Sequence, residues 1–156
     1  MEKNKKNIDH AEKARQLFFE GYNCAQAVVC AFTDITGIDM ETSARLASSF
    51  GGGMGRMREV CGSVSGALMV LGIALGYSDP KDPEAKKSHY HLVQDFAARF
   101  KEKNGSIVCR ELLTGVEVSP GLEPEERTAE YYKKRPCPDL IADAAGIVDE
   151  MLADHL

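Results

Sequence analysis

The chain has 156 residues, 44% hydrophobic and 28% charged, a composition typical of one globular domain with one hydrophobic core, here expected over residues 1–156. The formal net charge of −5 argues against a nucleic-acid-binding protein, which needs clustered Lys and Arg to replace phosphate counterions. No secretory signal or bilayer-spanning apolar stretch is present, so we expect a cytoplasmic protein with reduced or metal-bound thiols.

The apolar residues of the N-terminal third recur with a helical period. This pattern predicts a helix over residues 9–20, and a second helix that starts after an Asn23 cap and ends at Gly37. A third, short helix is predicted over residues 40–50, with Asp39 as its cap. The second helix is expected to bury four residues along one face: Cys24, Val28, Phe32 and Ile35.

A glycine-rich loop over residues 51–56 leads to the most apolar segment of the chain, residues 62–75. Because this segment is apolar nearly all round, we place it at the centre of the fold. Its glycines form two pairs spaced four apart, which we expect to let neighbouring helices approach closely: Gly62 with Gly66, and Gly72 with Gly76.

The second half of the chain continues the helical pattern. The sequence Asp82-Pro83-Glu84 starts the longest predicted helix, and Pro138 opens the last one. Between them we expect a short helix over residues 106–114, then a loop that carries a small charged helix. The sequence therefore predicts an all-α domain, a bundle of about six or seven helices around an apolar central helix.

Four of the five cysteines lie where a predicted helix begins: Cys24, Cys61, Cys109 and Cys137. The apolar residues three and four positions later share each cysteine's face, so we expect the four thiols to point inward. A helix N-terminus carries partial positive charge and unpaired N–H groups, which favour a thiolate over a thiol. We therefore predict one shared site for redox chemistry or metal. Cys30 faces away from it and is expected to act as a small hydrophobic residue.

Several kinds of site use four such cysteines, although simple packing in the core is also open. Structural zinc usually draws on local CxxC pairs, and none occurs here. An iron–sulfur cluster tolerates wider spacing and is stabilised by backbone N–H groups near its sulfur. Four glycines near Cys61 would let the main chain approach such a group: Gly52, Gly53, Gly55 and Gly62. A metal-free dithiol–disulfide cycle would use the same cysteines, although a βαβ framework is absent.

The other polar motifs give weaker signals. The loop GGGMGR lacks the preceding strand and the lysine of a phosphate-binding loop, and we expect Arg56 or Arg58 to be solvated unless it binds an anion, a partner or the charge of a cluster. Residues 133–135 are expected to form a solvated helix end or to dock an acidic electron-transfer partner. We expect surface positions for all four histidines: His10, His89, His91 and His155.

Several segments occur in a characteristic order: GYNCAQAV around Cys24, FGGGMGR, CGSVSG over residues 61–66, and then the separate Cys109 and Cys137. With these segments the chain resembles the C_GCAxxG_C_C family, small proteins with four characteristic cysteines and a CGAxxG motif. Ser63 replaces the alanine of that motif and offers a hydrogen bond to sulfur. The resemblance implies a redox role for the same four cysteines. The family is also similar to a domain of split-Soret cytochromes, which implies an iron–sulfur site, whereas the lack of CxxCH excludes a c-type cytochrome.

The leading hypothesis is a redox-active protein that binds an iron–sulfur cluster through its four helix-starting cysteines and transfers electrons to a partner oxidoreductase. One alternative is a metal-free thiol–disulfide enzyme that uses the same cysteines. Another is a helical interaction module whose cysteines only fill the core. The ligand set could also be completed across a homodimer.

Overall fold

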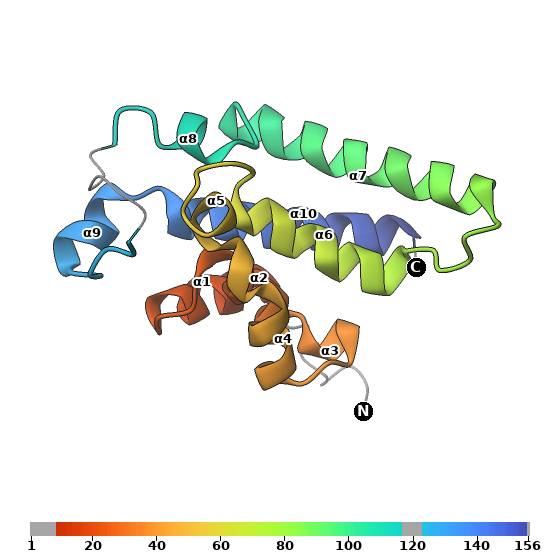
Figure 1. Ribbon diagram of the computed structural model, residues 1–156, viewed down its shortest axis with the longest axis horizontal. Coiled ribbons are helices and arrows are strands. Elements are labelled where there is room, and N and C mark those ends of the chain that lie inside the picture. The colour runs from red at the N-terminus through yellow and green to blue at the C-terminus, as the bar shows by residue number, and fades with distance from the viewer. Residues whose placement is uncertain (1–8, 117–122, 156) are drawn as a thin grey trace.

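The computed structural model describes residues 9–116 and 123–155 (Figure 1). Residues 117–122 of the predicted loop lie outside this part of the chain. The elements are α1 (His10–Phe19), α2 (Cys24–Ala31), α3 (Thr33–Thr36), α4 (Met40–Ala47), the 3-10 turn η2 (Ser48–Phe50), α5 (Gly51–Met54), α6 (Gly62–Leu75), α7 (Pro83–Asn104), α8 (Cys109–Leu112), α9 (Ala129–Lys134) and α10 (Cys137–His155). In the described residues, β-type pairing is limited to one antiparallel bridge between Val60 and Val108, so the predicted all-α class is confirmed.

Side-chain caps fix the starts of five helices. In each, the capping side chain accepts a hydrogen bond from the backbone N–H three residues later. The capping residues are Asp9, Asn23, Asp39, Asp82 and Thr128. The helix predicted to run from Asn23 to Gly37 is interrupted at Phe32, which has φ −111° and ψ 25°. The break redirects the following turn, so Ile35, which we expected to be buried, is 36% exposed.

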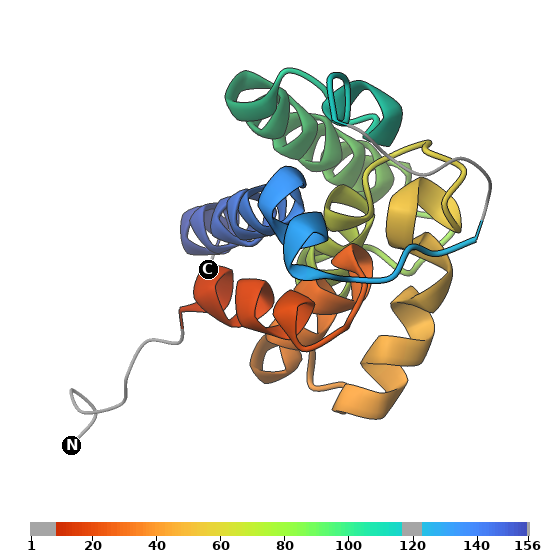
Figure 2. The ribbon, with the colours of Figure 1, turned by 90° about the vertical axis from the view of Figure 1, so that its left-hand side faces the viewer.

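The helices pack in layers. α6 and α10 run side by side through the middle of the molecule, α7 lies along one side of this pair, and α1 to α4 lie on the other (Figure 1). Figure 2 shows the same layers from the end of the molecule. Burying one large apolar side chain contributes about 1.5–3 kcal/mol to folding. The largest fully buried side chains are Phe18, Phe32, Phe96, Phe100, Leu71, Ile141, Ile147 and Met151.

Glycine brings α6 close to α2, as predicted for the first glycine pair. A Cβ added to Gly66 would lie 2.7 Å from the carbonyl oxygen of Ala25, so a larger residue would force the helices apart. The second pair does not act in this way, because a Cβ on Gly72 would meet nothing within 4 Å. The prediction of a bundle around α6 alone is not confirmed, since α6 shares the middle of the molecule with α10 and Ile73 in its last turns is 54% exposed.

His10 is buried, and the prediction of a surface position for it is wrong. It is only 6% exposed and its ring stacks on Phe32 with 4.1 Å between centroids. Its Nδ1 lies 2.8 Å from Asp149 and its Nε2 lies 3.0 Å from Asp34. Burial lowers the pKa of this imidazole, but the hydrogen bonds to the two carboxylates raise it further, so that the pKa lies above its ordinary value. His10 thus ties α1 to α3 and α10.

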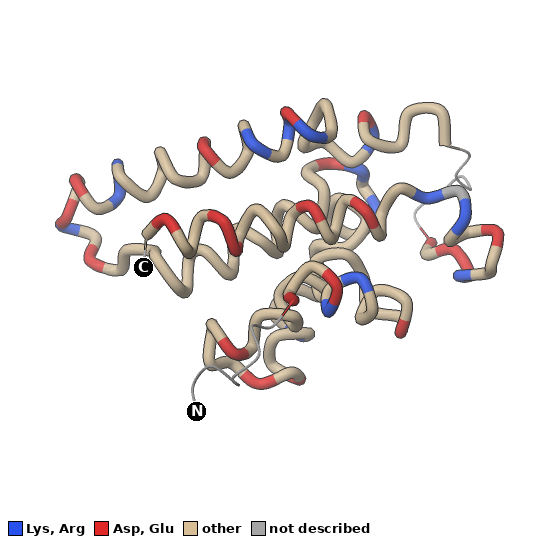
Figure 3. Tube along the Cα trace, turned by 180° about the vertical axis from the view of Figure 1, so that it is seen from behind, with Lys and Arg blue, Asp and Glu red and all other residues tan. Residues whose placement is uncertain are grey.

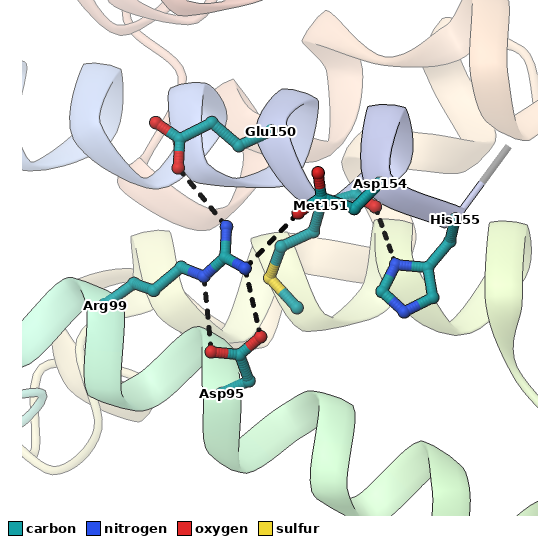
Figure 4. Close-up of polar contacts among 6 residues, drawn as sticks. All are labelled: Asp95, Arg99, Glu150, Met151, Asp154 and His155. Atoms are coloured by element: carbon teal, nitrogen blue, oxygen red, sulfur yellow. Dashed lines mark hydrogen bonds and ion pairs between the residues drawn. The ribbon is translucent and has the colours of Figure 1, made fainter.

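The long helices α7 and α10 are also joined by charge. Figure 3 shows acidic residues along α10, which contains no Lys or Arg, and charges of both signs along α7. Arg99 of α7 contacts Asp95 on its own helix and Glu150 and Asp154 on α10, at 3.2 to 3.4 Å (Figure 4). Such exposed pairs contribute about 0–1 kcal/mol each. None of the described helices combines the length and apolar composition that crossing a membrane requires.

Candidate functional site

The four cysteines predicted to form a site all lie at helix starts. Cys24, Cys109 and Cys137 are the first residues of α2, α8 and α10, and Cys61 immediately precedes α6. In Figure 1 the starts of α6 and α10 lie together with α5 and α8 at one end of the molecule, and this end faces the viewer in Figure 2. Because α6 and α10 both begin at this end, Cys61 and Cys137 lie at the same end of the fold although they are far apart in the sequence.

The same four cysteines line one cavity of about 70 Å³, which we call the cysteine cavity. This volume is several times the roughly 10–15 Å³ that one water molecule requires. The side chains of Cys61 and Cys109 are almost completely buried, at 5% and 8% exposure. Cys30 does not line the cavity; it is fully buried on α2, with its Sγ 3.8 Å from the carbonyl oxygen of Met40, as expected for a small core residue.

Two of the four predicted glycines lie at the cysteine cavity. Gly62 approaches Cys24 so closely that an added Cβ would lie 2.4 Å from the Sγ, and the backbone of Gly52 hydrogen-bonds the same thiol. Gly53 does not line the cavity but packs against a residue that does, since a Cβ added to Gly53 would lie 2.8 Å from the Cβ of Cys109. Gly55 lines a neighbouring cavity instead. The glycine loop therefore contacts the site through its first half.

Two polar side chains contact sulfur directly. The Oγ of Ser63 lies 3.0 Å from the Sγ of Cys61, as expected from the serine that departs from the CGAxxG motif. Arg58 Nη1 donates to the Sγ of Cys109 at 3.7 Å, so this arginine contacts one of the four cysteines. Both contacts would stabilise negative charge on sulfur.

Burial raises the pKa of Cys24, and it raises the pKa values of Cys61 and Cys137 to about 12. Neighbouring thiols add to this effect: Cys24 raises the pKa of both Cys61 and Cys137, and Cys109 raises that of Cys24. The expectation that helix N-termini would favour the thiolate is therefore wrong for these three residues. Backbone hydrogen bonds do lower the pKa of Cys24, but desolvation outweighs them.

Three aromatic or cationic residues in the cavity wall were not predicted: Arg127, Tyr131 and Arg135. The run of residues 133–135 does not end in a solvated arginine, because Arg135 is 7% exposed and forms an ion pair with Glu125. Arg127 donates to the carbonyl oxygens of Phe18 and Tyr22 at 2.6 and 2.9 Å. The position of Arg135 two residues before Cys137 was the one available signal for its role.

The arrangement of the ligand atoms restricts what can bind. Within residues 9–116 and 123–155, no three His, Cys, Asp or Glu side chains form a group that could hold a metal ion.

A protein-family model described as "Putative redox-active protein (C_GCAxxG_C_C)" matches residues 22–151, which is most of the chain. The matched range contains all four cysteines that line the cavity. No curated protein and no solved structure matches the chain.

Proposed function

Since the chain belongs to the C_GCAxxG_C_C family of redox-active proteins, we propose that it binds an iron–sulfur cluster through Cys24, Cys61, Cys109 and Cys137. In this proposal it passes electrons to a partner oxidoreductase. The observation that carries the proposal is that one cavity brings together these four thiols, from four separate helix starts, and leaves out the fifth. A set of cysteines that only filled the core would have no reason to share one cavity.

The sequence spacing of the cysteines supports a cluster over zinc, because structural zinc usually draws on local CxxC pairs, and none occurs in this chain. A cluster distributes its thiolates over several iron atoms and adds its own inorganic sulfide, so its ligands stand farther apart. Ligation would also offset the burial that keeps the thiols protonated, because a positive centre favours the thiolate.

The cluster, when bound, would supply reversible one-electron chemistry. The protein would supply the surroundings that set its potential. Ser63 and Arg58 would donate hydrogen bonds to the sulfur atoms of Cys61 and Cys109, and the backbone of Gly52 would do so for Cys24. Apolar wall residues would limit water around it: Phe18, Leu112, Leu113, Leu140 and Ile141.

The metal-free alternative has less support. A disulfide-exchange enzyme needs an accessible thiol with a lowered pKa to attack its substrate. Cys61 and Cys109 are buried, and although Cys24 and Cys137 are only half-buried, desolvation raises the pKa of Cys24 and raises that of Cys137 to about 12. We therefore keep electron transfer as the proposed function.

Anaerobic purification followed by iron, acid-labile sulfide and visible-absorbance measurements tests this proposal. We expect a coloured protein with stoichiometric iron and sulfide. Cys61→Ala should lose both, whereas Cys30→Ala, which removes the thiol outside the cavity, should keep both. A colourless wild-type protein with two titratable disulfides would support the metal-free enzyme instead. Loss of iron in Cys30→Ala would show that the ligands were wrongly chosen.

A further inference from the structure

A wall of side chains separates the cysteine cavity from the neighbouring cavity of about 270 Å³. Exposed residues form part of the neighbouring cavity's wall, among them Ser48 and Pro124, so solvent reaches this space. Arg127 and Tyr131 line both cavities and therefore belong to the wall between them. Both come from residues 127–134, which are α9 and the two residues before it. We call this segment the cover.

The cover lies at the edge of the fold. In Figure 1, α9 lies at the end where the cysteine-bearing helices start, outside the layers of long helices. Arg135, the residue after α9, is extended, with φ −96° and ψ 135°, so the cover joins α10 through a non-helical connection. A rotation at this connection would break no helix. The outer side of the cover is in solvent, at Thr128, Ala129, Glu130 and Lys133.

Arg127 fastens the cover to the end of α1. Its guanidinium donates to the carbonyl oxygens of Phe18 and Tyr22, at 2.6 and 2.9 Å. The guanidinium carbon also lies 4.2 Å from the centre of the Phe18 ring, a distance at which a cation is attracted to the ring face. Carbonyl oxygens at the end of a helix carry partial negative charge and lack helical partners, so they favour a cation.

Tyr132 adds an apolar attachment to the same part of α1. The centre of its ring lies 5.8 Å from that of Phe18 and 5.0 Å from that of Phe19. Aromatic pairs at such distances stabilise by about 0.5–1.5 kcal/mol beyond the area that they bury. Arg127 and Tyr132 together hold the cover against α1, and in this position Tyr131 forms part of the cavity wall.

A group bound by all four cysteines must first reach the two that are buried. Cys61 and Cys109 are 5% and 8% exposed, so part of the cavity wall has to move before a ligand can reach them. Other parts of this wall come from the starts of α2, α6 and α10, and these helices pack against one another in the core. Short peripheral segments open at a lower free energy than core helices. The cover is therefore the part of the wall that opens most easily.

We propose that Arg127 is a positioning residue that holds the cover closed over the cysteine cavity, and that opening of the cover gives access to the thiols from the neighbouring cavity. The group admitted would be the iron–sulfur cluster, and this part of the inference rests on the proposed function. The closed cover would then keep water and other solutes away from the sulfur atoms. The opening itself is a property of the chain and requires no metal.

Alkylation of the reduced, metal-free full chain with N-ethylmaleimide, followed by peptide mass mapping, tests the inference one cysteine at a time. Arg127→Gln should react at Cys61 and Cys109 about ten-fold or more faster than the wild type, the effect of losing a charge-assisted hydrogen bond that holds the cover. Cys30 should keep its rate, because it is fully buried outside the cavity and reacts only when the core unfolds.

Two further variants keep this test decisive. Tyr132→Ala removes the apolar attachment without changing a residue that lines either cavity, and it should also accelerate the two buried cavity thiols but not Cys30. Arg99→Gln removes a guanidinium of α7 that lines neither cavity and should leave all rates unchanged. Unchanged rates in Arg127→Gln, or an equal acceleration of Cys30, would overturn the inference, because the second result is that of general destabilisation.

Iron and sulfide are measured on anaerobically purified samples of the same variants. If the wild type holds a cluster, Arg127→Gln should release iron to a chelator about ten-fold faster, since release requires the same opening. Selective alkylation without any iron or sulfide would reject the cluster and retain the cover. Iron and sulfide without selective alkylation would reject only the cover.

Discussion

A Cβ on Gly62 would lie 2.4 Å from the Sγ of Cys24, so the start of α6 contacts the first thiol of the site through the one residue type that leaves room for it. The same Cβ would lie 2.7 Å from the carbonyl oxygen of Phe50. The fold thus positions Cys24 by contact between backbone and sulfur, before any ligand is considered.

Gly62→Ala should therefore displace Cys24 and destabilise the protein by about 1–3 kcal/mol, the usual cost of overpacking. Urea unfolding measures the stability, and iron analysis after anaerobic purification should show a loss of cofactor. Gly72→Ala is the matched control, because it lies in the same helix and its Cβ would meet nothing within 4 Å. There the better helix propensity of alanine should stabilise the protein by up to about 1 kcal/mol. Equal behaviour of the two variants would contradict the proposed contact.

Ser63→Ala should lower the midpoint potential of the proposed cluster. Its Oγ lies 3.0 Å from the Sγ of Cys61, and a hydroxyl that donates to a ligand thiolate stabilises the more negative, reduced state. One hydrogen bond contributes on the order of 1 kcal/mol, and about 59 mV corresponds to a tenfold change for one electron, so we expect a shift of tens of millivolts. Redox titration followed by visible absorbance measures it.

The alanine variant restores the residue of the CGAxxG motif, so its cofactor content should match that of the wild type. Ser65→Ala, two residues further along α6, controls for the loss of a hydroxyl near the site. A potential that stays unchanged in Ser63→Ala, or that moves equally in both variants, would show that the Ser63 contact does not act on the redox centre.

The local features of this fold were predictable from the sequence. Caps such as Asp9 and Asn23 act within three residues, and the start of α6 at Gly62 follows from a change of composition. The four cysteines could be chosen together because each lies at a helix start, which is itself a local property.

What could not be predicted depends on partners far away in the sequence. His10 is buried because Asp149, 139 residues later, pairs with it, and Arg127 is fixed by the carbonyl oxygen of Phe18, 109 residues earlier. The raised pKa of Cys61 could not be predicted for the same reason. The field at a helix N-terminus is local, whereas the burial that raises the pKa comes from tertiary packing.

The free energy of unfolding should fall as the pH rises through the neutral range, because His10 then loses its proton and with it a stabilising charge. Its pKa in the folded state lies above the ordinary value of 6.5 because the hydrogen bonds to Asp149 and Asp34 outweigh burial. The folded state therefore holds the proton more tightly, and this stabilisation is complete below pH 6.5 and lost above the folded-state pKa. Urea unfolding between pH 5.5 and 8.5 measures the trend.

His10→Gln should flatten that part of the stability curve. His91→Gln, which changes an exposed histidine of α7, should leave it as in the wild type. A curve that falls just as steeply without His10 would assign the pH dependence to other groups.

Asn23 should couple the stability of α2 to the position of Cys24, the next residue. Its Oδ1 accepts from the N–H of Gln26 at 2.8 Å, and the Gln26 side chain accepts from the N–H of Asn23 at 3.0 Å. Asn23→Ala removes half of this capping box and should cost about 0.5–2 kcal/mol. It should also lower the cofactor content, because the first turn that carries Cys24 would fray.

The control is Asp39→Ala, which removes the cap of α4. Asp39 lines neither the cysteine cavity nor the neighbouring cavity, so this variant should cost a similar free energy with full cofactor content. Urea unfolding and iron analysis of both variants separate the two effects, and equal iron in the two would mean that the cap stabilises α2 without positioning the thiol.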